Sequence, residues 1–359
     1  MSDMIRQRVE TVQKELPADA ALLLTGEANR FYFTGYPATD GFVVITREKA
    51  VLLTDFRYIE KAKATVTACE VQLSAKGWQD VAAFCAAQGV RTLYVETETL
   101  SIRDLGKLRE AMGDIAVSED DRFDRTVAEM RSVKAPEEID RICAAQKMTD
   151  ETFAYILDRI EPGRTEREIM LDMEFYMRRL GSEGVSFDFI VVSGKNSSLP
   201  HGVPTDKAVE KGDFVTMDFG AVVDGYRSDM TRTVAVGHAD AAQKRVYDTV
   251  LKAQLAAIDA VRPGAVCRDI DRIARDIINA AGFEGCFGHG LGHSVGIEIH
   301  ESPCFNTRCE TVLRPGTVMT VEPGIYLENR YGVRIEDMVV TTADGCRDLT
   351  ESPKDLIIL

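Results

Sequence analysis

Residues 212–230 read GDFVTMDFGAVVDGYRSDM. An Asp-Gly pair between two runs of β-forming residues, here Asp224-Gly225, is the strongest short-range signal for a β-hairpin. With those two residues as the loop, Asp218 lies opposite Thr231. Asp229 is then a diagonal neighbour of Asp218 on the same face, roughly 7–8 Å away at the backbone. The stretch therefore predicts a hairpin that presents two acids on one side.

A second version of the pattern follows about 100 residues later, in GTVMTVE (316–322) and GVRIE (332–336). Its two acids, Glu322 and Glu336, correspond to the two acids of the hairpin. A Pro-Gly pair also precedes a helical segment in each half. Ordered self-similarity is a mark of duplicated structure. We therefore expect two similar helix-plus-strand halves related by a pseudo-twofold axis, with four carboxylates meeting near it.

The apolar runs before Asp218 and Glu322 predict that these acids are buried. Burial of an unpaired carboxylate is costly, and several carboxylates close together repel one another. Such acids are either protonated, paired with cations such as Arg227 and Arg334, or bound to metal. Two short side chains leaning inward can clasp ions about 3.5–4 Å apart, and we favour metal.

Three of the five histidines, His289, His293 and His300, fall in GHGLGHSVGIEIHE at 288–301. The glycines between them allow close approach of the backbone. One neutral imidazole among several carboxylates suits a divalent ion such as Mn²⁺, Co²⁺ or Zn²⁺. The cluster therefore supports the metal hypothesis.

The composition excludes several classes of protein. A chain of 359 residues predicts two domains, and a formal net charge of −15 argues against binding to nucleic acid or to an anionic membrane. No apolar run is long enough to span a bilayer, and the charged N-terminal residues have no apolar core, so we expect neither a membrane span nor a secretory signal. Eight scattered cysteines without C-x-x-C predict reduced thiols in the cytoplasm.

The first 130 residues alternate apolar runs with helical segments, which predicts an α/β domain over 1–130 and a second domain over 131–359. The segment RSVKAPEE at 131–138 reads as the link, with Pro136 at the start of a helix. Thr165 and Glu168 have the spacing of a capping box before another helix. The expected elements of the first domain are strands at 21–24, 41–45, 51–54 and 92–95 and helices at 55–65 and 77–88.

In their order, these residues resemble the pita-bread metallopeptidase family, which includes methionine aminopeptidase, aminopeptidase P and prolidase. The family has the ligand order Asp, Asp, His, Glu, Glu. The resemblance implies an α+β fold, in which a pita-bread domain follows a smaller α/β creatinase-like domain, and two divalent metal ions, Mn²⁺ first and Co²⁺ or Zn²⁺ as alternatives. The matching pieces are MDFG (Asp218), SDMTRT (Asp229), GHGLGHSVG (His293), VEPG (Glu322) and RIED (Glu336).

Further positions resemble the proline-specific branch of the family. They are His201 in PHG, His289, His300 in IHE and Arg334. The resemblance implies that all four contact the peptide substrate and that His201, His300 and Glu322 take part in catalysis. FYFTGY (31–36) and TDFRY (54–58) resemble the accessory domain of this branch. Ser294 stands where many relatives have Gly, and we expect little effect from it.

The resemblance also assigns roles to the ligands. Asp218 would chelate one metal, His293 and Glu322 would hold the other, and Asp229 and Glu336 would bridge the two. Glu322 would shuttle the proton. His201 and His300 would stabilise the developing oxyanion.

The first functional hypothesis is an Xaa-Pro aminopeptidase of the aminopeptidase P type, acting as a homodimer on peptides with proline at the second position. Prolidase, which cleaves only Xaa-Pro dipeptides, shares every residue named and stays open. A metal-free enzyme of the creatinase type and a non-catalytic binding scaffold are further alternatives. Both lack the full ligand set, so the five intact positions argue against them.

Overall fold

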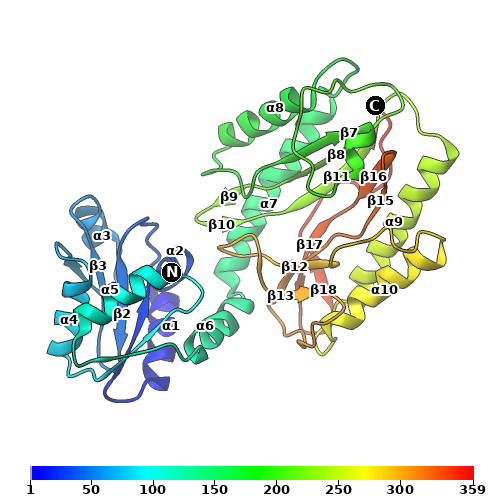
Figure 1. The fold of residues 1–359 in the computed structure, drawn as a ribbon. Coiled ribbons are helices and arrows are strands. Elements are labelled where there is room, and N and C mark those ends of the chain that lie inside the picture. The colour runs from blue at the N-terminus through cyan, green and yellow to red at the C-terminus, as the bar shows by residue number, and fades with distance from the viewer. Residues whose placement is uncertain (1) are drawn as a thin grey trace. The chain divides into compact units, whose positions relative to one another are not determined.

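The computed structural model describes residues 2–359. Its internal contacts divide the chain into two units, one ending at Met130 and one beginning at Arg131 (Figure 1). Each unit is described by itself. Within the described residues, no helix combines the length and the apolar character needed to cross a membrane.

The first unit is built on one six-stranded mixed sheet with the order β4-β3-β2-β1-β5-β6. β1, β2 and β3 form an antiparallel meander, whereas β4, β5 and β6 pair in parallel with their neighbours. Helices connect the parallel strands, as such connections require. The strands are β1 (Ala20–Leu24), β2 (Phe42–Thr46), β3 (Ala50–Thr54), β4 (Glu70–Leu73), β5 (Thr92–Val95) and β6 (Ala116–Ser118).

The helices of this unit are α1 (Ser2–Glu15), α2 (Glu27–Thr34), α3 (Ile59–Thr65), α4 (Trp78–Ala87) and α5 (Ile102–Met112). The predicted α/β character is therefore present. The helix expected at 55–65 begins later, at Ile59, because Asp55 holds a turn. One carboxylate oxygen of Asp55 accepts from the Arg57 amide at 2.8 Å, and the other accepts from Arg57 Nε at 2.9 Å.

The link between the units is shorter than expected. α6 (Arg122–Ser132) runs through the predicted boundary, and α7 (Pro136–Leu157) begins at the predicted proline. Only residues 133–135 separate the two helices. α8 (Glu166–Arg179) starts with the predicted capping box, in which the Glu168 amide donates to Thr165 Oγ1 at 3.2 Å.

The first half of the second unit forms a three-stranded sheet with the order β11-β8-β7. Asp218 pairs with Thr231 and Val223 with Tyr226, so the predicted register is correct. The second arm of the hairpin is interrupted at Ser228-Asp229. The elements after α8 are β7 (Ile190–Ser193), the 3₁₀ turn η1 (Gly194–Ser198), β8 (Phe214–Phe219), β9 (Val222–Val223), β10 (Tyr226–Arg227) and β11 (Met230–Ala235).

The second half has a five-stranded sheet with the order β13-β12-β14-β17-β18 and a separate β15–β16 hairpin. Two helices precede the strands, α9 (Ala241–Ala260) and α10 (Cys267–Ala280). The strands are β12 (Gly292–Ser294), β13 (Glu301–Phe305), β14 (Val318–Val321), β15 (Gly324–Leu327), β16 (Tyr331–Arg334), β17 (Asp337–Thr341) and β18 (Cys346–Asp348).

The predicted duplication is visible in the order of elements. Each half has two helices, α7 and α8 or α9 and α10, followed by a buried strand and a short hairpin. Glycines at matching places have positive φ, 92° at Gly212 and 87° at Gly316. Figure 1 shows the strands of both halves in the middle of the unit, with α7 and α8 on one side and α9 and α10 on the other.

The halves join where β11 meets the chain between β16 and β17. The Glu336 amide donates to the Thr231 carbonyl at 3.1 Å, and Thr233 Oγ1 donates to the Arg334 carbonyl at 3.0 Å. This junction carries Glu336 to the hairpin that holds Asp229. The predicted α+β fold with a pseudo-twofold repeat is confirmed.

Candidate metal centre

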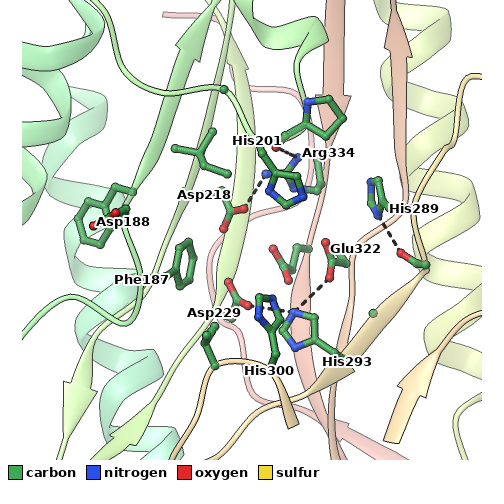
Figure 2. Close-up of a pocket in the computed structure, with 18 of the residues that line it drawn as sticks. Phe187, Asp188, His201, Asp218, Asp229, His289, His293, His300, Glu322 and Arg334 are labelled. Atoms are coloured by element: carbon green, nitrogen blue, oxygen red, sulfur yellow. Dashed lines mark hydrogen bonds and ion pairs between the residues drawn. The ribbon is translucent and has the colours of Figure 1, made fainter. Parts of the chain in front are cut away.

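A cleft of about 1170 Å³ opens in the second unit. All nine candidate site residues of the sequence analysis line it, and Figure 2 shows most of their side chains pointing toward the same floor. These residues are His201, Asp218, Asp229, His289, His293, His300, Glu322, Arg334 and Glu336.

The two acids of the first half reach the floor from the hairpin. Asp218 lies on β8, and Asp229 directly precedes β11. Both are buried, at 8 % and 4 % exposure. Gly220 lies opposite Asp229 in the hairpin. Its lack of a side chain lets the two strands approach closely at this point, because a Cβ on it would lie 1.9 Å from the Ser228 carbonyl oxygen.

The second half supplies an imidazole and two acids. His293 Nε2 lies 3.6 Å from Asp229 Oδ2 and 3.4 Å from Glu322 Oε1. Among the described residues, Asp229, His293 and Glu336 offer ligand atoms that all lie within 4.8 Å of one another. Strands from both halves thus converge on one small volume.

The hydrogen bonds around His293 fix its tautomer. Nδ1 faces the Ser294 carbonyl oxygen at 3.2 Å, and an oxygen there can only accept, so Nδ1 carries the proton. The lone pair of Nε2 therefore points at the acids. Burial, and then the neighbouring His300, lower the pKa of His293 to about 4, so the ring is neutral at pH 7. A neutral imidazole aimed at carboxylates is a metal-ligand geometry.

The carboxylates are not balanced by the cations around them. Arg334 Nη2 donates to Asp218 Oδ2 at 2.6 Å, and it contributes one positive charge against four carboxyl groups. Arg227, the other cation considered, donates to the Ile297 carbonyl at 2.9 Å. Asp218 Oδ1 and Asp229 Oδ1 are buried and have no hydrogen-bond partner among residues 2–359.

This imbalance raises the pKa values of the acids. Burial, followed by repulsion from Glu336, Asp218 and Glu322, raises the pKa of Asp229 well above its ordinary range. Burial raises the pKa of Glu322 to about 8. Burial and repulsion from Glu322 and Asp218 likewise raise that of Glu336.

The donor set fits divalent metal ions. Two buried oxygens without partners, crowded carboxyl groups and one imidazole lone pair form a site that a cation would complete. Protonation of the acids alone would still leave Asp218 Oδ1 and Asp229 Oδ1 without a hydrogen-bond partner in the described part of the chain. The ion pair with Arg334 neutralises only one of the four carboxylates, that of Asp218.

Three hydroxyl groups at the site were missed by the sequence analysis. Thr231 Oγ1 donates to Glu336 Oε2 at 2.6 Å, and Thr320 Oγ1 donates to Glu322 Oε1 at 3.2 Å. Each threonine lies on a strand whose apolar pattern gave no sign of this role. The third hydroxyl is that of Tyr326.

Tyr326 links two of the predicted substrate-side residues. His289 Nδ1 donates to the Gly290 carbonyl at 2.8 Å, which leaves Nε2 to accept from Tyr326 OH at 2.9 Å. The same tyrosine oxygen accepts from Arg334 Nη1 at 2.8 Å. Burial raises the pKa of Tyr326 to about 12 and lowers that of His289 to about 4, so both stay neutral.

The remaining two histidines border the floor. The His300 ring meets that of His293 edge-on, with centroids 4.4 Å apart. His201 follows Pro200, whose carbonyl accepts from Arg334 Nη1 at 3.2 Å. Figure 2 shows His201 and His300 on either side of the acids.

A duplicated α+β domain with crowded carboxylates and one neutral imidazole at the floor of a cleft defines the class of a metal-dependent hydrolase. Comparison with known proteins agrees. Residues 140–343 match the metallopeptidase family M24, and residues 6–133 match the creatinase/prolidase N-terminal domain. The chain therefore belongs to metallopeptidase family M24, and the predicted family is confirmed.

Individual relatives cover nearly the whole chain. The structure of an Xaa-Pro dipeptidase from Bacillus anthracis has a TM-score of 0.94 and 39 % identity, with 100 % of both chains covered. An Xaa-Pro dipeptidase of Pyrococcus horikoshii is 35 % identical over 99 % of both chains. The structure of an X-Pro aminopeptidase from Thermotoga maritima has a TM-score of 0.90 and 34 % identity, with 97 % of this chain and 100 % of that one covered.

Proposed function

We propose that this chain is a peptidase that uses two divalent metal ions to hydrolyse the bond before a proline, acting on Xaa-Pro dipeptides. The observation that carries the proposal is the pair of buried, partnerless oxygens on Asp218 and Asp229, beside the lone pair of His293. The metallopeptidase family and the Xaa-Pro activities named for its relatives support the substrate class.

The ions would be held by Asp218, Asp229, His293, Glu322 and Glu336. Mn²⁺ is the first candidate, and Co²⁺ or Zn²⁺ are alternatives, because a site of carboxylates with one imidazole accepts all three. When bound, the ions supply a water of lowered pKa and polarise the scissile carbonyl.

The protein's own groups have separate tasks in this reaction. Glu322, which touches Thr320 Oγ1 and faces His293, holds and returns the proton. His300 and His201, at the two sides of the floor, donate to the carbonyl oxygen as negative charge develops on it. Arg334 and His289, joined through Tyr326, bind the substrate.

The choice between dipeptidase and aminopeptidase changes from the first hypothesis. The Xaa-Pro dipeptidase of B. anthracis shares 39 % identity and a TM-score of 0.94, against 34 % and 0.90 for the aminopeptidase of T. maritima. This difference favours the dipeptidase. The aminopeptidase remains the second candidate, because the site residues are common to both.

The deciding experiment combines metal analysis with a substrate panel. Protein stripped with chelator and reloaded with Mn²⁺ should bind about two equivalents and cleave Ala-Pro, with Ala-Ala as the negative control. Cleavage of Ala-Pro but not of Ala-Pro-Gly supports the dipeptidase, whereas cleavage of the tripeptide supports the aminopeptidase. Full activity without metal would point to chemistry of the creatinase type, and neither metal nor activity would point to a binding scaffold.

The proposal includes a homodimer in the cytoplasm, which the sequence resemblance supports. Light scattering during gel filtration measures the oligomer: a mass of twice the 39.7 kDa chain is the expected result. A monomeric mass at micromolar concentration would remove the dimer from the proposal without affecting the chemistry.

A further inference from the structure

A second group of charged side chains lies behind the histidines of the cleft. Ser294 directly follows His293, and Glu301 directly follows His300. Because neighbouring side chains in extended chain point to opposite faces, the histidines line the cleft while Ser294 and Glu301 turn away from it. Ser294 and Glu301 pair across β12 and β13 at a bulge in the register.

Lys134 forms hydrogen bonds with both Ser294 and Glu301 on the side away from the cleft. Its Nζ donates to Ser294 Oγ at 2.6 Å and to Glu301 Oε2 at 3.2 Å. The Lys134 side chain is 1 % exposed and that of Glu301 is 5 % exposed. Arg131 also contacts Glu301, through Oε1. Burying a lysine to this degree costs free energy unless its partners are well placed. The contacts of Lys134 with Ser294 and Glu301 are therefore needed to stabilise its buried charge.

The loop between the two histidines is folded around the Glu301 carboxylate. The amides of Ile297 and Glu298 donate to Glu301 Oε1 at 3.0 and 3.1 Å. Gly296 packs against the same group, since a Cβ there would lie 2.7 Å from Glu301 Oε2. The position of the carboxylate therefore sets the path of residues 294–301, and with it the separation of His293 and His300.

The base of the Lys134 side chain is itself fixed. The Lys134 amide donates to the Gly316 carbonyl at 2.9 Å, in the turn before β14. A Cβ on Gly316 would lie 3.0 Å from the Lys134 carbonyl oxygen, so the two backbones are in close contact. Strand β14 leads to Glu322. Lys134 thus ties the histidine loop to the strand that carries a cleft acid.

We propose that Lys134 is a positioning residue for the peptidase reaction: through Ser294 and Glu301 it holds His293 and His300 at the separation that catalysis needs. This inference rests on the proposed function. Lys134 does not line the cleft, so its side chain can affect the substrate only indirectly, and its contacts with Ser294 and Glu301 lead to the two histidines. Outer-shell partners of metal-binding residues typically account for about 10–100-fold in activity or metal affinity, and small misplacements of reacting groups are costly.

The first test is Lys134→Met, which keeps the length of the side chain and removes its charge and hydrogen bonds. In the Mn²⁺-loaded enzyme with Ala-Pro as substrate, we expect kcat to fall about 10–100-fold while KM changes less than about threefold. Lys207→Met is the matched control, because Lys207 Nζ also donates to a serine, Ser193, at 3.0 Å and to a carboxylate, Asp213, at 2.6 Å. The control should keep kcat within about threefold.

A double variant separates positioning from stability. Lys134→Met alone leaves the Glu301 charge buried with one partner fewer, and it is expected to destabilise the fold. Lys134→Met combined with Glu301→Gln removes both charges, and neutral replacement of a buried pair often restores stability. Positioning predicts that the melting temperature recovers while kcat stays at least about tenfold low. Recovery of kcat together with stability would show that the pair only stabilises the fold.

The outcomes also separate this inference from the proposed function. If the wild-type enzyme cleaves Ala-Pro and Lys134→Met matches its kcat, the positioning role is refuted and the peptidase assignment stands. If the wild-type enzyme loaded with Mn²⁺ cleaves no Xaa-Pro substrate, the proposed function is refuted, and the role assigned to Lys134 is refuted with it.

Discussion

Two clusters of buried charge lie back to back at the junction of β11 with the start of β17. Glu336 lines the cleft and accepts from Thr231 Oγ1, whereas their chain neighbours Asp337 and Arg232 do not line it. In the second cluster every charge has partners. The Arg232 guanidinium donates to Asp337 Oδ1 at 2.7 Å and to the Ser352 carbonyl at 2.8 Å, and Lys354 Nζ lies 2.6 Å from Asp337 Oδ2.

The cleft cluster is equally buried but is left incomplete. Glu336 is 1 % exposed and Asp229 is 4 % exposed, close to the 0 % of Asp337. Yet Asp218 Oδ1 and Asp229 Oδ1 have no partner among the described residues. Burial is therefore not what distinguishes a functional acid here. The distinguishing property is negative charge that the surrounding protein does not neutralise, which marks a place for a ligand.

The largest effect is expected from removing an acid of the cleft cluster. Asp229→Ala or Glu336→Ala should lower kcat on Ala-Pro by at least about 10³-fold, because the ions and the water they activate are lost. The fold should survive, since deleting one crowded carboxyl group relieves repulsion. Steady-state kinetics with circular dichroism test both statements. An unchanged kcat in either variant would refute the bridging role.

The next effect concerns the completed cluster. Arg232→Met should lower the free energy of unfolding by about 3–5 kcal/mol, because it leaves a buried Asp337 without its main partner. Urea unfolding measures the change. Adding Asp337→Asn should restore part of the loss, since the uncompensated charge disappears. If Arg232→Met lowered the free energy of unfolding by less than about 1 kcal/mol, the pairing of Asp337 would not matter for stability, and the proposed difference between the two clusters would be refuted.

A smaller effect is expected in the pH dependence of the metal-free protein. The pKa of Glu322 rises from 4.5 to about 8 on folding, so between these values the folded chain holds a proton that the unfolded chain has lost. Wild-type stability therefore falls relative to Glu322→Gln as pH rises through this window. Because the side chain is 16 % exposed, we expect a gap on the order of 2 kcal/mol at pH 8.

Thermal or urea unfolding at a series of pH values, with chelator present, measures this gap. Adding Mn²⁺ should reverse the loss in the wild type, since the ions favour the ionised carboxyl group. If the difference in stability between the wild type and Glu322→Gln stayed constant from pH 5 to pH 8, the raised pKa of Glu322 would be contradicted. The charge of the cleft cluster would then be neutralised by the protein, as it is in the second cluster.

The smallest effect is expected at the edge of the cleft cluster. Tyr326→Phe removes the hydroxyl between His289 and Arg334, and it should cost about 1 kcal/mol, or about five- to tenfold in kcat/KM. Tyr331→Phe in the same hairpin is the matched control, because the buried Tyr331 hydroxyl has no partner within residues 2–359. Equal kcat/KM values for the two variants would show that the Tyr326 link does not act on the substrate.

The features predicted correctly from the sequence depend on local patterns. The Asp224-Gly225 loop determined the hairpin register that places Asp218 opposite Thr231. The capping box at Thr165 and the proline at the start of α7 are likewise signals within a few residues. The duplication could be read because both halves repeat the same turn and strand chemistry.

The features that were missed depend on contacts between distant segments. Tyr326, Thr320 and Lys134 have no local signature, because their partners are set by how the strands of the second unit pack. Arg232 lies between Thr231 and Thr233 on β11, and only the fold shows that it pairs with the buried Asp337. Boundaries such as the start of α3 at Ile59 depend on a turn that Asp55 and Arg57 build together.

The junction of the two halves also determines when the site can form. Asp229 and Glu336 are over a hundred residues apart in the chain, and they meet only after the second half has docked on the first. Neither half alone gathers the full set of donors, so a dissolved cation has no preorganised pocket on a nascent or half-folded chain. Contacts of high sequence separation must pay a large loop-closure entropy before they form, so we expect ion binding to follow the completion of the domain.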